Sequence, residues 1–169
     1  MDKKKISLIC QGIVIFGALL AFIGLFLNAA HISLPAIAGG GSRSVDMNGF
    51  QFASDTPSAS FWLTFGLYMT LIVSIITIVH AALIIASIKV EALKVLSTHR
   101  LLKWDMIGLP VLLLIVTAIY MIGAGNPASG TGASMINEMI RPGVGPILAL
   151  IGGIIAVAAG IAAFVTGKE

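Results

Sequence analysis

The chain has 169 residues, of which 58% are apolar and only 10% are charged. A soluble domain carries roughly 25% charged residues, so this composition excludes an ordinary water-soluble protein. The formal net charge is +3, but membrane orientation explains the basic residues, and we expect no nucleic-acid partner.

Four apolar segments account for most of the chain, and each is long enough to cross a bilayer. A hydrocarbon core of about 30 Å requires about 20 residues of helix. We therefore predict an all-α membrane protein, a bundle of four transmembrane helices that forms a single domain over residues 1–169. The predicted spans cover residues 6–27, 61–88, 104–122 and 144–165.

The basic residues gather on one side of this predicted bundle. Of the ten Lys and Arg residues, all but Arg43 and Arg141 flank the chain ends or lie between the second and third spans. Loops rich in Lys and Arg stay in the cytoplasm, so we expect cytoplasmic termini and two outer loops. No N-x-[ST] site occurs and Cys10 is the only cysteine, which favours a bacterial plasma membrane.

The first outer loop, before the second span, has the pattern of a small β-hairpin. Residues 31–37 are extended in character, and the glycine-rich stretch 38–42 is typical of a turn. The stretch 44–52 alternates apolar and polar residues, except for a bulge or tight bend expected at Asn48-Gly49. Its apolar positions are Val45, Met47, Phe50 and Phe52. The alternative interpretation is a flexible loop.

The second span carries a polar face at helical spacing. That face consists of Thr70, Ser74, Thr77 and His80. His80 lies toward the cytoplasmic side, where it could meet Gln11 or Cys10 of the first span. An ionisable residue inside a span is a functional hypothesis by default. We consider a structural hydrogen bond between helices and a proton or ligand role for His80.

Beyond the second span, the helix is expected to continue to residue 96 and to reverse at residues 97–100. This basic connection is expected to touch anionic lipid headgroups, the alternative being a dedicated partner site. In the third span, Pro110 is expected to kink the helix.

The second outer loop, before the fourth span, contains a short amphipathic stretch. Residues 134–141 are predicted to form two helical turns with Ser134 as the N-cap. One face would carry Met135, Ile136, Met139 and Ile140. That face is interpreted either as a lid over the bundle or as an outer surface for a partner protein.

Small residues recur at every third or fourth position in the first and fourth spans. They include Gly17, Ala21 and Gly24 in the first span, and Gly152, Ala156, Gly160 and Ala163 in the fourth. Small residues allow helix backbones to approach closely in lipid. These faces are expected to pack within one bundle or, for the fourth span, to dock a second subunit.

The sequence lacks the usual patterns of catalytic chemistry. No Asp or Glu lies deep in a span, and there is no glycine-rich phosphate loop and no zinc-ligand spacing. We therefore expect no catalytic, cofactor-binding or metal-binding residues. An enzyme would require His80, or His99 beside Arg100, to join residues from another chain.

The layout of four spans, cytoplasmic ends, a longer first outer loop with strands and a shorter second loop resembles the claudin-like tetraspan plan. The resemblance covers the whole chain as topology. The claudin loop motif of Trp, Gly-Leu-Trp and two cysteines is absent, since this loop has no Cys and Trp62 lies at its end. No functional residues carry over.

These observations lead to two hypotheses of function. The first is a non-catalytic membrane protein that acts through contacts, as an accessory, regulatory or protective subunit of a membrane complex. The alternative is a small homo-oligomeric transporter or channel whose copies line a path with the polar face of the second span. The expected partners are the lipid bilayer and either another membrane protein or further copies of this chain.

Overall fold

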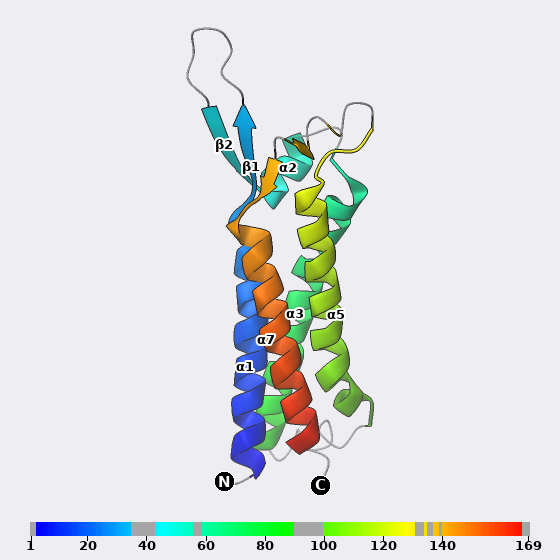
Figure 1. Ribbon diagram of the computed structural model, residues 1–169. Coiled ribbons are helices and arrows are strands. Elements are labelled where there is room, and N and C mark those ends of the chain that lie inside the picture. The colour runs from blue at the N-terminus through cyan, green and yellow to red at the C-terminus, as the bar shows by residue number, and fades with distance from the viewer. Residues whose placement is uncertain are drawn as a thin grey trace.

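A computed structural model of the protein describes residues 3–34, 43–55, 59–89, 100–130, 134, 137–138 and 140–166. The predicted arrangement of four long helices is confirmed, and each is long and apolar enough to cross a membrane. The helices run side by side (Figure 1): α1 (Lys3–Gly24), α3 (Phe61–Lys89), α5 (Arg100–Gly125) and α7 (Val144–Thr166). We call the two ends of the bundle the sheet end, where the strands lie, and the terminal end, where α1 begins and α7 ends.

The helix bounds differ from the predicted spans mainly in α1 and α5. Helix α1 ends at Gly24 instead of residue 27, because the hydrogen bonds after Gly24 change from the α-helical to the 3₁₀ pattern. The amides of Leu25 and Phe26 donate to carbonyls only three residues back, at 3.2 and 3.0 Å, and such bonds are common in the last turn of a helix. Helix α5 extends beyond its predicted span at both ends and includes Pro110. The connection predicted over residues 90–99 lies outside the described residues.

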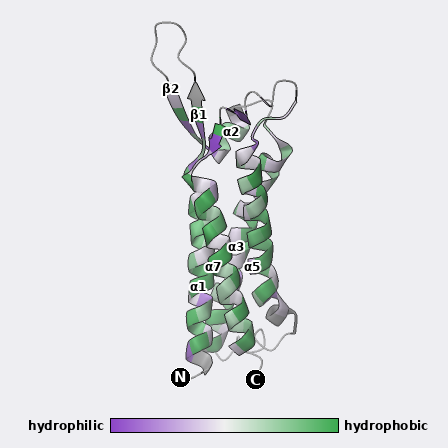
Figure 2. Ribbon diagram, in the orientation of Figure 1, coloured by the Kyte–Doolittle hydropathy of each residue, from purple (hydrophilic) through white to green (hydrophobic). Residues whose placement is uncertain are grey.

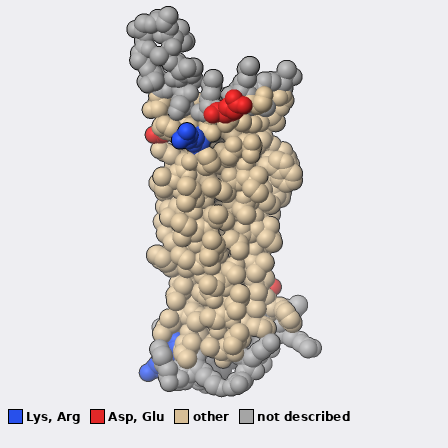
Figure 3. All heavy atoms as spheres, viewed as in Figure 1, with Lys and Arg blue, Asp and Glu red and all other residues tan. Residues whose placement is uncertain are grey.

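The outer surface of the helices is apolar along most of their length (Figure 2). Charged side chains visible in Figure 3 lie near the two ends of the bundle, with uncharged residues between them. Large apolar side chains such as Phe16, Ile76 and Ile154 are about half exposed. Such a surface is stable in lipid and would be costly in water.

Helices α1 and α7 pack with their backbones in close contact. A Cβ atom added to Gly17 would lie 2.6 Å from the carbonyl oxygen of Gly152, and one added to Gly24 would lie 2.6 Å from that of Gly145. Gly160 faces α5 instead, where a Cβ would lie 2.6 Å from the carbonyl oxygen of Met106. The small faces of the first and fourth spans therefore pack inside one bundle.

The other small residues expected at these contacts are also buried. Ala21, Ala156 and Ala163 are each exposed by 1% or less. A partner subunit could reach these residues only if the bundle opened, because the helices of the same chain already cover them.

A three-stranded antiparallel sheet lies at the sheet end. It contains β1 (Asn28–Leu34), β2 (Arg43–Asn48) and β3 (Ile140–Pro142), in the order β2-β1-β3. Strands β1 and β2 form the predicted pair. The third strand comes from the loop before α7, so the prediction of a hairpin alone was incomplete. The glycine-rich stretch 38–42 lies outside the described residues.

The strand predicted up to residue 52 ends earlier, and a short helix follows it. Helix α2 (Gly49–Asp55) begins after Asn48, whose Oδ1 accepts a hydrogen bond from the amide of Gln51 at 2.8 Å. The Asn48 amide donates in return to Gln51 Oε1 at 3.3 Å. This reciprocal pair is a capping box, and it starts the helix where a bulge was expected. Phe52 still packs into the core, at 2% exposure.

The prediction of two helical turns over residues 134–141 was wrong at the C-terminal end of this stretch. Ser134, Asn137 and Glu138 are helical, but Ile140 begins β3. The Asn137 side chain holds this segment to the chain just after α5, because its Oδ1 accepts from the Ala128 amide at 3.0 Å. Pairing with β1 satisfies the backbone of residues 140–142, which explains why the strand replaces the last helical turn.

A matched pair of glycine substitutions tests the contact between α1 and α7. Gly152→Ala is expected to lower the free energy of unfolding by about 1–3 kcal/mol, because the added methyl overlaps the backbone of α1. Gly12→Ala on the exposed side of α1 meets no atom within 4 Å and should leave stability unchanged or higher. Unfolding in detergent measures both, and equal effects would contradict the close packing.

Candidate functional site

The sheet has one apolar face and one polar face. Ile32 lies opposite Val45 on β2 and Ile140 on β3. Ile32 packs against the core cluster at the sheet end, and Ile140, at 5% exposure, belongs to that cluster. Because side chains alternate along a strand, the residues between these positions point away from the core. The apolar face thus rests on the helix ends, and the polar face is free to meet other molecules.

Three ionisable side chains lie side by side on the polar face. His31 on the central strand is directly opposite Asp46 on β2 and Arg141 on β3. Side chains opposite one another in an antiparallel sheet share a face, with Cβ atoms about 4.5–5.5 Å apart. We call Asp46, His31 and Arg141 the charged row.

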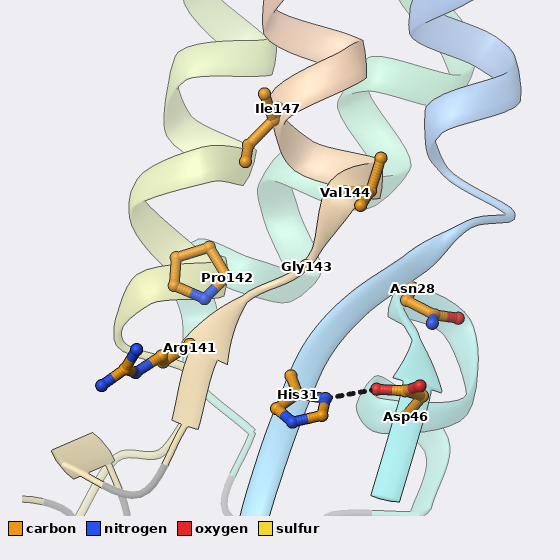
Figure 4. A pocket seen from close by; sticks show the side chains of 8 residues that line it. All are labelled: Asn28, His31, Asp46, Arg141, Pro142, Gly143, Val144 and Ile147. Atoms are coloured by element: carbon orange, nitrogen blue, oxygen red, sulfur yellow. Dashed lines mark hydrogen bonds and ion pairs between the residues drawn. The ribbon is translucent and has the colours of Figure 1, made fainter.

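Within the charged row, His31 and Asp46 form a close pair. The Nδ1 atom of His31 lies 2.6 Å from Oδ1 of Asp46, and the side chains are 44% and 50% exposed. The guanidinium of Arg141 lies at the far side of the row and points away from the pair (Figure 4). Arg141 forms no ion pair with any described residue.

A surface hollow of about 460 Å³ lies between the charged row and the first turn of α7, where the sheet meets that helix (Figure 4). Its lining on the sheet side is polar, with Asn28 beside the charged row, and its lining on the side of α7 is apolar. The apolar part consists of Val144 and Ile147 in the first turn of α7, with exposures of 64% and 43%. The hollow therefore offers charge and apolar surface to the same ligand.

Gly143 joins β3 to α7 and lines the hollow where these two elements meet. Its amide donates to the Ala29 carbonyl at 2.8 Å, and a Cβ at this position would overlap the carbonyl of Asn28. The close approach places the start of α7 beside the sheet. A helix N-terminus carries a partial positive charge, so it adds to the attraction of Arg141 for anions.

The polar face predicted for the second span is buried in the bundle of a single chain. Thr70, Ser74 and Thr77 have exposures of 0–1%. Ser74 Oγ donates to the Leu71 carbonyl at 2.9 Å, and Thr77 Oγ1 donates to the Val73 carbonyl at 2.7 Å. Hydroxyls that bond to their own helix are a common structural arrangement.

The hydrogen bond expected between His80 and the first span is not formed within the described part of the chain. Nε2 of His80 and Nε2 of Gln11 are both buried and lack a hydrogen-bond partner there. Gln11 is only 2% exposed. These two groups lie inside the bundle, so they do not form a surface site.

The surface predicted for a partner in the second outer loop is largely outside the described residues, which exclude Met135, Ile136 and Met139. For the fourth residue, Ile140, the prediction of an exposed position was wrong. Ile140 is buried in β3 at 5% exposure and packs against the core, so it belongs to no exposed face.

Sequence reasoning did not identify the charged row. His31 and Asp46 occupy polar positions in the two stretches predicted as strands, which is a weak signal of an outward face. Nothing in the sequence around Arg141 indicates a strand, because β3 has only three residues. The row exists only through the pairing of three segments distant in sequence.

The charged row has the groups to bind a polar ligand. Among the described residues that line the hollow, none is a Ser, Thr or Cys. Among the described residues, no group of three or more His, Cys, Asp or Glu side chains could hold a metal ion. The side chains of the charged row can form ion pairs and hydrogen bonds with a ligand.

Compared with known protein families, curated proteins and solved structures, the chain matches none of them. The claudin-like resemblance therefore rests on the layout of the sequence alone.

A double-mutant cycle tests the His31–Asp46 pair. His31→Gln and Asp46→Asn, made singly and together, are expected to give a coupling free energy of about 0.2–1 kcal/mol. The coupling is small because both side chains are half exposed and water screens their interaction. Unfolding in detergent measures all four proteins, and a markedly larger coupling would contradict the exposed geometry.

Proposed function

We propose that this chain is a non-catalytic membrane protein that works by contact with another membrane protein. It would serve as an accessory, regulatory or protective subunit, and its partner would dock at the sheet end. The observation that carries this proposal is the free edge of β2. In the sheet order β2-β1-β3, the outer edge of β2 has no neighbouring strand among the described residues.

The position of β2 favours strand addition by a partner. Strands β1 and β2 project beyond the helix ends (Figure 1), and Ser44, Val45 and Asp46 are all exposed. An unpaired edge presents backbone donors and acceptors to an extended segment of another chain. The helices beneath hold the sheet in place through its apolar face.

The channel alternative has no comparable support. A path between copies would need the polar face of α3 on the outside of the bundle. Thr70, Ser74 and Thr77 lie inside instead, at 0–1% exposure, and the outer surfaces of the helices are apolar. Charged or hydrated substrates would find no favourable contacts along such a surface.

We also propose an orientation, with the termini in the cytoplasm of a bacterium and the sheet outside its plasma membrane. The support is the distribution of basic residues, because only Arg43 and Arg141 lie in the segments at the sheet end. Short segments rich in Lys and Arg resist translocation.

Cysteine labelling tests this orientation. In a Cys10→Ser background, Ser44→Cys should react with a membrane-impermeant maleimide on intact cells, because Ser44 is exposed at the sheet end. Lys5→Cys at the terminal end should react only after the membrane is opened. If Lys5→Cys reacts on intact cells and Ser44→Cys does not, the protein has the opposite orientation.

Partner docking is tested by mass spectrometry of the intact assembly after gentle extraction from the native membrane. Wild type should carry a different protein in fixed stoichiometry. Ser44→Pro should lose that partner, because the amide of Ser44 faces the outer edge of β2, whereas the amide of Val45 faces Ile32 on β1. Proline removes this amide and fixes φ. Ser44→Thr is the control that keeps the amide and a hydroxyl side chain at the same place and should retain the partner.

Two results would contradict the docking proposal. One is a partner that remains on Ser44→Pro at wild-type stoichiometry, which would place its contact elsewhere. The other is a protein that is extracted alone or only as copies of itself. The thermal unfolding of both variants must resemble that of wild type, so that a lost partner reflects the strand edge and not a damaged bundle.

A further inference from the structure

The hollow between the charged row and α7 lies at the level where a membrane surface would meet the protein. Helix α7 has 23 residues, so its length is about 35 Å. The hydrocarbon core of a bilayer is about 30 Å thick. The start of α7, with Val144 in its first turn, must therefore lie close to the boundary between acyl chains and headgroups.

The lining of the hollow changes from apolar to charged across that boundary. Val144 and Ile147 present exposed apolar side chains on the helix side. The charged row presents Arg141, His31 and Asp46 on the sheet side. A ligand that fits both halves has a polar head and an apolar tail, as a membrane phospholipid has.

We propose that this hollow binds the headgroup of a zwitterionic phospholipid with a primary amine, phosphatidylethanolamine. Arg141 and the N-terminus of α7 would hold the phosphate. Asp46 would accept hydrogen bonds from the ammonium group, since an ionised carboxylate can accept several. The acyl chains would lie along Val144 and Ile147.

The charges of the row fit this headgroup better than others. Arg141 and Asp46 carry one positive and one negative charge at opposite ends of the row, which matches a phosphate and an ammonium in one headgroup. The headgroup of phosphatidylglycerol has the phosphate but no ammonium, so it leaves the carboxylate of Asp46 without an opposite charge. A choline headgroup has no N–H group to donate to the carboxylate.

The two end residues of the row can engage a ligand at little cost to the fold. The side chain of Arg141 is exposed and forms no ion pair with the described residues, so it can turn over the hollow. His31 holds Asp46 through Nδ1 and leaves Nε2 as the ring nitrogen that can face the headgroup. This lipid site uses the side chain of Asp46, whereas strand addition on β2 would use the backbone.

The test is native mass spectrometry of the delipidated full-length chain in detergent. The protein is titrated with phosphatidylethanolamine, phosphatidylglycerol and phosphatidylcholine of identical acyl chains. We expect the ethanolamine lipid to bind most tightly. Arg141→Gln should weaken its binding about tenfold, a change equivalent to about 1.4 kcal/mol, whereas Lys5→Gln at the terminal end should leave it unchanged.

Asp46→Asn provides a readout that does not depend on overall affinity. It should abolish the preference for phosphatidylethanolamine over phosphatidylglycerol, because it removes the negative charge that faces the ammonium. This change in selectivity remains measurable if Arg141→Gln destabilises the sheet. Thermal unfolding of each variant identifies such a loss of structure.

Three results would overturn the proposal. Equal binding by wild type and Arg141→Gln, with both folded, would indicate only non-specific lipid around the helices. Tighter binding of phosphatidylglycerol by wild type would contradict the role of Asp46. Displacement of the lipid by an equal concentration of glycerophosphoethanolamine would indicate a soluble phosphate ester as the ligand, because that compound has the headgroup without the acyl chains.

Discussion

The close contact between α1 and α7 determines much of the remaining structure. Gly17 and Gly24 allow the two backbones to meet without intervening side chains. Because the helices are antiparallel, the end of α1 and the start of α7 arrive at the same place. The Gly143 amide then reaches the carbonyl of Ala29, and β3 pairs with β1. The sheet, the charged row and the hollow are consequences of this helix packing.

The features that depend on local sequence were predictable, whereas those that depend on pairing between distant segments were not. Apolar length identified the four helices, and alternation around Val45 and Met47 identified the strands. The capping box at Asn48 and Gln51 has a sequence signal, but it was interpreted as a bend in a strand. The charged row required the pairing of β3 with β1, which three residues around Arg141 do not encode.

Burial gives the two groups of polar residues different roles. The hydroxyls of Ser74 and Thr77 bond to their own helix inside the bundle, and they add no exposed chemistry. His31 and Asp46 pair across two strands at half exposure, where a ligand can reach them. Sequence alone favoured the interior group, because polar residues inside spans are conspicuous. In the structure, the exposed polar residues of interest lie on the sheet. Their types are common in any loop sequence, but the strand pairing brings His31, Asp46 and Arg141 side by side.

The sheet joins two helices with very short connections, and this has a mechanical consequence. Only residues 25–27 separate α1 from β1, and only Gly143 separates β3 from α7. These short connections and the backbone contact between α1 and α7 tie the sheet to this helix pair. A molecule bound to the sheet is therefore held in a defined orientation relative to the two helices.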